Sequence, residues 1–516
     1  MGDTLYDILK ATARTHGPKV AFYADNTATT YRQFLQRATW LARGLRRLGV
    51  RPGDRVAVLL PNVTPVPLTV FAAAACGATV VPLNPLLSGA ELARILKHAQ
   101  PRILVTAAQL LTPDLEAAAA AVSPPVRILL AKAPPDGPHL DFTRVVKSGL
   151  LPLRRIPGAK PDDPAVIFYT SGTTGLPKGV MLSHRNVLAN ARSVGQLDLI
   201  LTDDVLVGIL PLFHAFAFTV SLVYITLVGA TTSYLLRFEP RALWRAVGDH
   251  KCTCLIAVPA MLALLSRGGK PPEAATLRLV VAGGDALPPE VQSEFESKFG
   301  LRVMEGYGLS EAGPVVAVNC RPNGPSTGSI GPPIPDVRVT IVDDDGREVP
   351  TGQVGELCVH SPALMMGYYQ DPEQTAAVLK DGWLHTGDLA RLDAQGNLSI
   401  AGRKKDLIIV AGENVFPAEI ERALLEHPAV ANAGVIGIAD ARRGEIVKAI
   451  VVLKDGQSAT EKDLIEHCRE RLALFKVPSD IAFAAELPVN FLGKVKRQAL
   501  REAQATAPRL TAPGGG

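Results

Sequence analysis

An excess of charge of either sign is missing from this sequence. Lys and Arg number 54 and Asp and Glu number 49 in 516 residues, which leaves a formal net charge of +5. The two signs are interspersed along the chain, whereas a nucleic-acid-binding surface needs clustered basic residues. The composition therefore excludes a nucleic-acid partner and favours small-molecule partners.

Cysteine is scarce as well, with six residues in the whole chain. Secreted disulfide scaffolds are far denser in cysteine, and Cys252 and Cys254 lack the CxxC spacing of a zinc site. We therefore expect reduced cysteines that lie in hydrophobic cores.

A continuous apolar leader is absent, because Asp3, Asp7 and Lys10 interrupt the apolar residues at the N-terminus. This pattern excludes the h-region of a signal peptide, so the expected location is the cytoplasm.

Two long uncharged runs, Val56 to Ala90 and Phe216 to Leu236, are the candidates for membrane spans. The first contains five prolines and is predicted to be a buried strand, a loop and a helix. The second is predicted to be an interior helix, which is apolar on all sides when the fold covers it. No transmembrane span is expected, and peripheral contact with a membrane is left open.

Alternating element types define the expected fold class. The 516 residues exceed one ordinary core and predict about two to four folding units. Helix-like stretches such as Tyr31 to Leu48 and Pro289 to Phe299 alternate with the apolar runs VAVLL, AVIFYT, TCLIAV and LRLVVAGG. This alternation predicts a large N-terminal domain of doubly wound α/β layers.

The pattern changes twice after about residue 325. The stretches RVTIVDDDGREVP and ARLDAQGNLSIAG are each typical of strand, polar turn and strand, which predicts a small antiparallel β subdomain. After GRKKD, helix-like Pro417 to Glu426 and the strand-like VVL predict a small α+β domain. The expected boundaries are 1–402 for the large domain, 403–506 for the small domain and 507–516 for a disordered tail.

The stretch YTSGTTGLPKG, at 169–179, combines hydroxyl-bearing residues, three glycines and a lysine directly after an apolar run. It is not a Walker A loop, because Lys178 follows Pro177 and precedes Gly179 instead of Ser or Thr. Its hydroxyls and backbone N–H groups are nevertheless suited to wrap a polyphosphate, with the lysine as counter-charge. By itself the stretch leaves an ordinary glycine-rich turn open.

Six further motifs follow in a fixed order along the chain. They are PLFHAFA at 211–217, AGGDALP at 282–288, EGYGLSEAG at 305–313, TGD at 386–388, GRKKDLIIVAGENVFPAEIE at 402–421 and GKVKR at 493–497. Together with SGTTGLPKG, the series resembles the adenylate-forming superfamily, which contains acyl-CoA synthetases, adenylation domains of peptide synthetases and beetle luciferases. The resemblance covers nearly the whole chain. It implies that ATP and Mg²⁺ activate a carboxylic acid as an acyl adenylate, which then reacts with coenzyme A.

The resemblance assigns the ATP phosphates to the SGTTGLPKG loop and the adenine to two glycine-rich loops. The implied nucleotide-binding residues are Thr170, Ser171, Gly172, Thr173, Thr174, Lys178, Gly283, Gly284, Asp285, Gly306, Tyr307, Gly308, Ser310, Asp388 and Arg403.

The chemistry of several of these side chains fits the implied roles. Glu311 offers a hard carboxylate oxygen to Mg²⁺, and Ser310, where the family usually has Thr, offers a hydroxyl to a phosphate. Tyr307 presents a ring on which adenine can stack. Asp388 accepts hydrogen bonds, as two ribose hydroxyls require, and Arg403 would complete the ribose and phosphate contacts.

Catalysis of the first half-reaction is assigned by the resemblance to Lys494, Glu311 and His214. Negative charge develops at the α-phosphorus, and the Lys494 ammonium would stabilise it while Mg²⁺ binds the leaving pyrophosphate. His214 would lie beside the carboxylate and gate its pocket. From their surroundings alone, a solvated basic cluster is the alternative for Lys494 and a core histidine is the alternative for His214.

The second half-reaction is implied to need a mobile small domain. That domain would rotate about Lys405, which removes Lys494 from the site and lets a thiol attack the acyl adenylate. Gly412 would then line the pantetheine tunnel, because a residue without a side chain lets a thin thiol arm pass.

The acid is expected to be a monocarboxylate with a hydrophobic tail, because the expected lining is apolar and offers no basic residue to a second carboxylate. The lining, from residues 187–230 and the loop EAGPVVAVN, comprises Phe213, Phe216, Phe218, Val220, Leu222, Val315 and Val316. The sequence most resembles bacterial medium- to long-chain fatty acid CoA ligases. Aryl-CoA ligases of the coumarate type and acyl-AMP ligases that load a carrier protein are the alternatives.

Two other classes of protein are disfavoured. A P-loop or kinase-like ATPase does not fit the failed Walker pattern, and a non-catalytic acyl-binding or membrane-associated protein does not need Glu311, Asp388, Arg403 and Lys494. The expected partners are thus a carboxylic acid, ATP and CoA, and a homodimer is left open.

Overall fold

The computed structural model describes residues 3–134, 137–151, 158–170, 178–320, 328–411, 413–440, 442–489 and 495–506. The chain divides into two compact units, Met1–Val339 with Val359–His385, and Thr340–Cys358 with Thr386–Gly516. It passes from one unit to the other within β16 (Arg338–Val342), β17 (Gly355–His360) and β20 (Trp383–Leu392). The domain boundary expected after residue 402 stays a prediction, and the tail expected at 507–516 lies outside the described residues.

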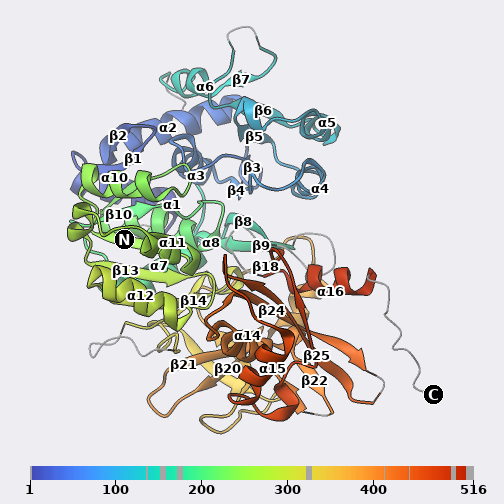
Figure 1. Ribbon diagram of the computed structural model, residues 1–516. Coiled ribbons are helices and arrows are strands. Elements are labelled where there is room, and N and C mark those ends of the chain that lie inside the picture. Colours follow the sequence, from blue (N-terminus) through green and yellow to red (C-terminus); the bar gives the residue numbers. More distant parts are fainter. Residues whose placement is uncertain are drawn as a thin grey trace. The chain divides into compact units, whose positions relative to one another are not determined.

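Two sheets, each of eight strands in the described part of the chain, form the frame of the first unit (Figure 1). The first sheet runs in the order β15 (Val315–Val318), β14 (Val303–Gly308), β13 (Leu279–Gly283), β12 (Cys254–Ala257), β10 (Val205–Gly208), β11 (Thr231–Tyr234), β1 (Val20–Ala24) and β2 (Thr27–Thr30). Its inner strands pair in parallel, and only the two edge pairs are antiparallel.

The second sheet has the same character. It runs in the order β18 (Gly367–Tyr368), β9 (Lys178–Ser183), β8 (Pro164–Thr170), β4 (Thr79–Pro82), β3 (Arg55–Val58), β5 (Ile103–Thr106), β6 (Arg127–Leu130) and β7 (Leu140–Asp141). The strands from β8 to β7 are parallel, and β9 pairs antiparallel with both β8 and β18. The expected α/β class with mainly parallel sheets is confirmed.

Helices connect these strands. They are α1 (Leu5–His16), α2 (Tyr31–Arg47), α3 (Pro65–Cys76), α4 (Gly89–Ala99), η1 (Ala108–Leu110), α5 (Pro113–Ala121), α6 (Phe142–Ser148), α7 (His184–Gly195), α8 (Ala215–Ala217), η2 (Phe218–Tyr224), α9 (Ile225–Val228), α10 (Pro240–His250), α11 (Pro259–Arg267), η3 (Pro272–Thr276), α12 (Pro289–Phe299), η4 (Ser310–Ala312) and α13 (Pro372–Val378). The short strand β19 (Leu379–Lys380) follows α13 and pairs with the start of β20. The bounds of α2 and α12 agree with the helices expected from the sequence to within one residue.

Local sequence explains where α2 begins. Thr30 accepts a hydrogen bond from the backbone N–H of Gln33, and the Gln33 side chain accepts one from the N–H of Thr30. This capping box satisfies two donors that the first turn of a helix leaves without partners. Behind it, Phe34 and Leu41 are buried on the face that packs against α3.

Both long uncharged runs lie within the first unit and are largely buried, although Leu86 and Leu236 are exposed. The run from residue 56 forms the expected strand and helix, β3 and α3, and then a further strand, β4, that was not predicted. The second forms a continuous helical stretch at 215–228, of which η2 is a π-helix, and then the strand β11. The expectation that it is helical as far as Leu236 is wrong, because Gly229 ends the helix in the left-handed conformation (φ +75°). Among the described residues, no helix is long and apolar enough to cross a membrane.

The six cysteines are free, as expected, and five of them are buried. Cys320 is the exception, because it follows the edge strand β15 and is partly exposed.

In the part of the chain that the structure describes, one sheet of five strands lies wholly within the second unit. These strands are β22 (Ile408–Val410), β23 (Glu413–Val415), β24 (Val430–Asp440), β25 (Gly444–Leu453) and β26 (Asp480–Phe483). The helical segments are η5 (Lys404–Asp406), α14 (Pro417–Leu425), α15 (Glu461–Arg469), η6 (Leu474–Lys476) and α16 (Arg497–Thr506). Figure 1 shows α14 and α15 side by side against this sheet, where Ile420, Leu424 and Leu464 join the core.

Both hairpins expected from the sequence are present in the second unit. The end of β20 pairs antiparallel with β21 (Leu398–Arg403), and Val342 bridges Glu348 across the turn DDDGR.

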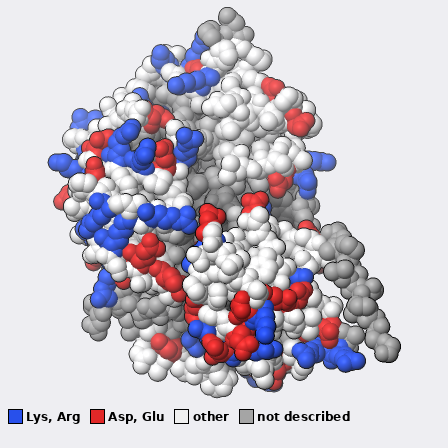
Figure 2. Space-filling view, viewed as in Figure 1, with Lys and Arg blue, Asp and Glu red and all other residues white. Residues whose placement is uncertain are grey.

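Acidic and basic side chains are interspersed on the face drawn in Figure 2, and neither sign covers that face alone.

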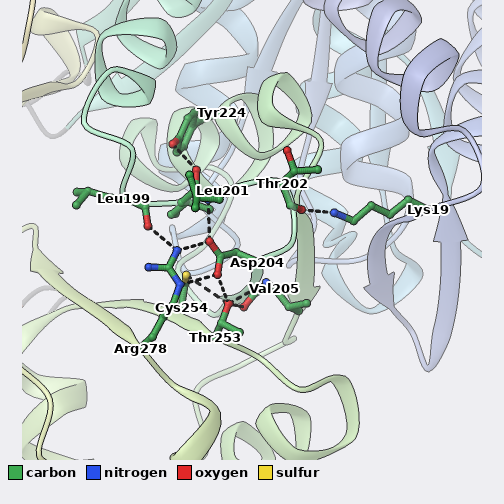
Figure 3. A network of polar contacts seen from close by, with 11 residues as sticks. Lys19, Leu199, Leu201, Thr202, Asp204, Val205, Tyr224, Thr253, Cys254 and Arg278 are labelled. Carbon is green, nitrogen blue, oxygen red and sulfur yellow. Dashed lines mark hydrogen bonds and ion pairs between the residues drawn. The ribbon is translucent and has the colours of Figure 1, made fainter.

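A buried carboxylate, Asp204, ties together three strands of the first sheet at their N-terminal ends (Figure 3). It accepts hydrogen bonds from the guanidinium of Arg278, with Nε at 2.8 Å, from the Thr253 hydroxyl at 2.7 Å and from the Leu201 N–H at 2.7 Å. Leu201, Thr253 and Arg278 come before the first residues of β10, β12 and β13, respectively. Burial raises the pKa of Asp204, but the bonds from Arg278, Leu201 and Thr253 outweigh burial and lower that pKa below its ordinary value.

We predict that Asp204→Asn lowers the free energy of unfolding by about 2 kcal/mol at pH 7, because an amide cannot accept all these bonds and leaves Arg278 uncompensated. The ionised carboxylate stabilises the fold above about pH 4, and this contribution is lost as the pH falls through the lowered pKa of the folded state. The difference between the variant and the wild type in urea unfolding should therefore shrink on acidification below pH 4.

The matched control is Asp162→Asn, because Asp162 also binds an arginine, Arg185, with both carboxylate oxygens, but at an exposed position. Exposed pairs contribute little to stability, so this variant should unfold with the wild type. Equal unfolding midpoints for the two variants would show that the Asp204 network is not a stabilising element.

Candidate active site

The base of the SGTTGLPKG loop is an antiparallel strand pair in the first unit. β8 ends at Thr170 and β9 begins at Lys178, and these two residues are partners in the strand register. Thr170 and Lys178 therefore lie opposite each other at the ends of the loop, as a phosphate-binding role for both requires. The other predicted loop residues, Ser171, Gly172, Thr173 and Thr174, lie outside the described residues.

Lys178 is linked to Glu311 through a tyrosine. The Lys178 ammonium donates to Gln374 Oε1 at 2.8 Å and lies 4.9 Å from the centroid of the Tyr368 ring. The hydroxyl of the same tyrosine donates to Glu311 Oε1 at 3.0 Å. Residues separated by up to 196 positions thus meet at one place, and the structure brings the predicted phosphate-binding lysine and the predicted metal ligand together.

Neither Tyr368 nor Gln374 is among the site residues predicted from the sequence. Both belong to the stretch GYYQDPEQT, in which Asp371 caps α13 by accepting from the N–H of Gln374. The helix cap at Asp371 could have been recognised in the sequence, and it would have marked the start of a helix. It could not have shown that the short strand β18, which contains Tyr368, pairs with β9.

The two predicted adenine loops lie side by side at the carboxyl ends of β13 and β14. Gly283 and Gly306 are register partners, and Gly284, Asp285 and Tyr307 follow them along the two strands. Open α/β sheets bind ligands at the carboxyl ends of their strands, so the location agrees with a nucleotide site.

Close packing requires glycine at position 308 and leaves little room for a side chain at position 283. A Cβ on Gly308 would lie 2.2 Å from the carbonyl oxygen of Pro314. A Cβ on Gly283 would lie 3.1 Å from Cε1 of Phe216, so that ring lies directly against the backbone of the loop. Phe216, a residue of the predicted acid pocket, therefore lies against the predicted adenine loop.

Asp285 is half-buried, and its carboxylate accepts a hydrogen bond from the N–H of Ala286 at 3.0 Å. After β14, Ser310 and Glu311 form the short helical segment η4, which Gly313 ends with a positive φ of +99°. The backbone carbonyl of Glu311 accepts from the N–H of Met365 at 2.9 Å. Both the backbone and the side chain of Glu311 are thus held by the segment that contains Tyr368.

His214 follows β10 and precedes the helical stretch that begins at Ala215. Its carbonyl accepts the N–H of Phe218 at 2.8 Å, and burial lowers the pKa of its imidazole to about 4. The ring is therefore neutral at pH 7 and does not attract a carboxylate by charge. A neutral imidazole can still donate one hydrogen bond to a carboxylate oxygen.

The predicted acid lining divides into two groups. Phe213 and Phe216 are partly exposed, as is the neighbouring His214, whereas the other five are buried in the core: Phe218, Val220, Leu222, Val315 and Val316. The segment 187–230 also includes a basic residue, Arg192 on α7. The expected lack of a basic partner for a second carboxylate therefore holds for the seven apolar residues but not for the whole segment.

In the second unit, the structure brings Asp388 and Arg403 together. They are register partners on β20 and β21, and Arg403 Nε lies 3.1 Å from Asp388 Oδ1. Asp388 is buried and its N–H donates to the Thr386 hydroxyl, while Arg403 is exposed. Arg403 therefore orients the Asp388 carboxylate, while Thr386 holds the backbone of the same residue.

Three motif residues without an assigned role form a second network in this unit. Arg497 of GKVKR donates to Glu421 at 2.6 Å and to Asp406 at 3.3 Å, and Asp406 also pairs with Arg501. The network joins the segment after Lys405 to the segment after Lys494 in the chain. Lys405 is exposed in η5, whereas Lys494 and Gly412 lie outside the described residues.

Comparison with known proteins agrees with this arrangement. The family model for the AMP-binding enzyme matches residues 9–369, and the model for the AMP-binding enzyme C-terminal domain matches residues 419–494. The chain belongs to the AMP-binding enzyme family. It is an acid–CoA ligase of the AMP-forming kind, which uses ATP.

Family members of known specificity differ in the acid that they use. A long-chain-fatty-acid–CoA ligase of Bacillus subtilis (strain 168) is 35% identical over 531 aligned positions, which cover 97% of this chain and 94% of the relative. A feruloyl-CoA synthase of an Amycolatopsis species is 36% identical and covers 95% of both chains. Among solved structures, ATP-bound MatB from Rhodopseudomonas palustris is 30% identical, with a TM-score of 0.90 and coverage of 98% and 99%.

We predict that Gly308→Ala slows acid-dependent pyrophosphate release roughly 100-fold, the effect typical of a displacement of about 1 Å in an active site. The added methyl group collides with the Pro314 carbonyl and must shift the turn that carries Ser310 and Glu311. Gly268→Ala is the control, because a Cβ there meets no atom within 4 Å. Wild-type rates in the Gly308 variant would show that this turn does not position reacting groups.

Proposed function

We propose that this ligase activates a medium- to long-chain fatty acid and transfers it to CoA. The observation that carries the proposal is the uncharged segment from Val205 to Leu236, which contains His214 and the partly exposed rings of Phe213 and Phe216. An apolar surface next to a neutral imidazole suits a carboxylate with a long hydrocarbon tail. The fatty-acid ligase relative supports this choice, and the feruloyl-CoA synthase relative favours the aryl alternative.

ATP would bind along the carboxyl ends of the strands in the first unit. The loop after Thr170 and the Lys178 ammonium would hold the β and γ phosphates, and Tyr307 would stack on the adenine. Asp388 would accept hydrogen bonds from both ribose hydroxyls, with Arg403 at the phosphate side.

Glu311 fits a magnesium ion in the number and hardness of its donors. Mg²⁺ prefers one or two carboxylate oxygens, together with water and phosphate oxygens. The Tyr368 hydroxyl donates to Oε1 of Glu311, so that, among the described residues, Oε2 is the oxygen left for a metal. The hydroxyl of the adjacent Ser310 would bind a phosphate oxygen. When bound, the ion would neutralise charge on the departing pyrophosphate.

In the first half-reaction a carboxylate oxygen of the acid forms a bond to the α-phosphorus of ATP. The bond from that phosphorus to the bridging oxygen breaks, and pyrophosphate leaves. Lys494 would stabilise the extra negative charge on the phosphoryl oxygens, and His214 would orient the carboxylate by donating a hydrogen bond.

In the second half-reaction the sulfur of CoA forms a bond to the acyl carbon, the thiol proton is lost, and the bond to AMP breaks. Rotation of the small domain about Lys405 would remove Lys494 and admit the thiol arm past Gly412. The ion pair between Asp406 and Arg497 would connect the segment after Lys405 to the segment after Lys494, so that the two would move together.

The test of the proposed acid is a panel of substrates assayed for pyrophosphate release and CoA thiol consumption. We predict that kcat/KM rises from hexanoate to dodecanoate, by up to about fourfold for each methylene that is buried at about 0.8 kcal/mol. Benzoate and coumarate should be poorer substrates than dodecanoate.

Two outcomes of this panel would contradict the proposal. A higher kcat/KM for coumarate than for dodecanoate would assign the enzyme to the aryl alternative. Pyrophosphate release without any consumption of CoA thiol would instead favour an acyl-AMP ligase that loads a carrier protein.

A further inference from the structure

Tyr368 contacts two groups of opposite charge with two different parts of its side chain. Its ring faces the Lys178 ammonium, 4.9 Å from the centroid, and its hydroxyl donates to Glu311 Oε1 at 3.0 Å. Lys178 and Glu311 form no ion pair with each other among the described residues. The tyrosine is thus the link between them and also the group that separates them.

The lysine is held by neutral partners. Gln374 accepts from its ammonium at 2.8 Å, and the face of the Tyr368 ring attracts the cation through its quadrupole. Neither contact neutralises the positive charge, so the charge stays available to a phosphate.

Tyr368 is itself fixed in place. It is buried, with 8% of its surface exposed, and its N–H donates to the Thr375 hydroxyl at 2.8 Å. Its backbone also pairs with Val180 of β9, the strand that begins at Lys178.

We propose that Tyr368 is a positioning residue that keeps Lys178 and Glu311 from pairing and orients the Glu311 carboxylate for the metal. The inference rests on the proposed function, in which Lys178 meets the ATP phosphates and Glu311 meets Mg²⁺. A lysine and a glutamate in direct contact in a partly buried site attract each other strongly, and ATP with its metal would have to break that pair. A neutral ring with a hydroxyl at its edge avoids this cost.

The two parts of the side chain can be tested separately by binding of α,β-methylene ATP, which the enzyme cannot cleave to pyrophosphate. Calorimetric titration with and without Mg²⁺ gives the metal-free affinity and the factor by which Mg²⁺ increases it. Tyr368→Phe removes the hydroxyl and keeps the ring, whereas Tyr368→Leu removes both.

We expect Tyr368→Phe to bind the metal-free analogue as the wild type does, and to lose roughly tenfold of the Mg²⁺ enhancement, the effect of one hydrogen bond to a charged group. Tyr368→Leu should also bind the metal-free analogue about fivefold more weakly, because the contact with the Lys178 cation is lost. The matched control is Tyr369→Phe. In the described structure, the Tyr369 hydroxyl that this variant removes accepts a hydrogen bond only from Gln370.

A double-mutant cycle separates positioning from a general effect on folding. In a Glu311→Gln background, adding Tyr368→Phe should change the Mg²⁺ enhancement no further, because the group that the tyrosine orients has gone. The wild-type Mg²⁺ enhancement in Tyr368→Phe, or full additivity in the cycle, would overturn the inference and leave the proposed function intact. A wild-type protein that fails to bind the nucleotide analogue would instead overturn the proposed function, and the inference with it.

Discussion

Lys178 and Glu311 carry opposite charges at one site, and the rest of the site depends on keeping both charges available. The proposed first half-reaction joins two anions, so it would need a cation for the phosphates and a carboxylate for the metal that would accompany them. Opposite charges at short range tend to neutralise each other in a partly buried place. The structure prevents this by giving each a neutral partner, with Gln374 for the lysine and the Tyr368 hydroxyl for the glutamate.

The first sheet separates the functional and the stabilising roles along its strands. Gly283 and Gly306 are partners toward the carboxyl ends of β13 and β14, where the proposed site would hold the nucleotide. At the opposite, N-terminal ends of β10, β12 and β13 lies the buried Asp204, and its ion pair with Arg278 connects the start of β10 to the start of β13. Substitutions at one end should therefore alter catalysis and those at the other should alter stability.

The sequence predicted the elements whose signals are local, such as the helix Pro289–Phe299 and the hairpin of β20 and β21. It also predicted that Lys178 and Glu311 serve one site, through the motif order. It did not predict the roles of Tyr368 and Gln374, because their partners depend on strand pairing between residues almost 200 positions apart. Nor did it predict the network of Arg497, since Arg497 lies in one motif and its partners Asp406 and Glu421 lie in another, more than 70 positions earlier in the chain.

The most direct test of the account is isotope exchange between labelled pyrophosphate and ATP in the absence of CoA. Because the acyl adenylate is formed reversibly before the thiol acts, the wild-type enzyme should incorporate label into ATP, and only when both dodecanoate and Mg²⁺ are present. Exchange that does not depend on the acid, or no exchange under conditions in which the full reaction with CoA proceeds, would contradict an adenylate intermediate in this protein.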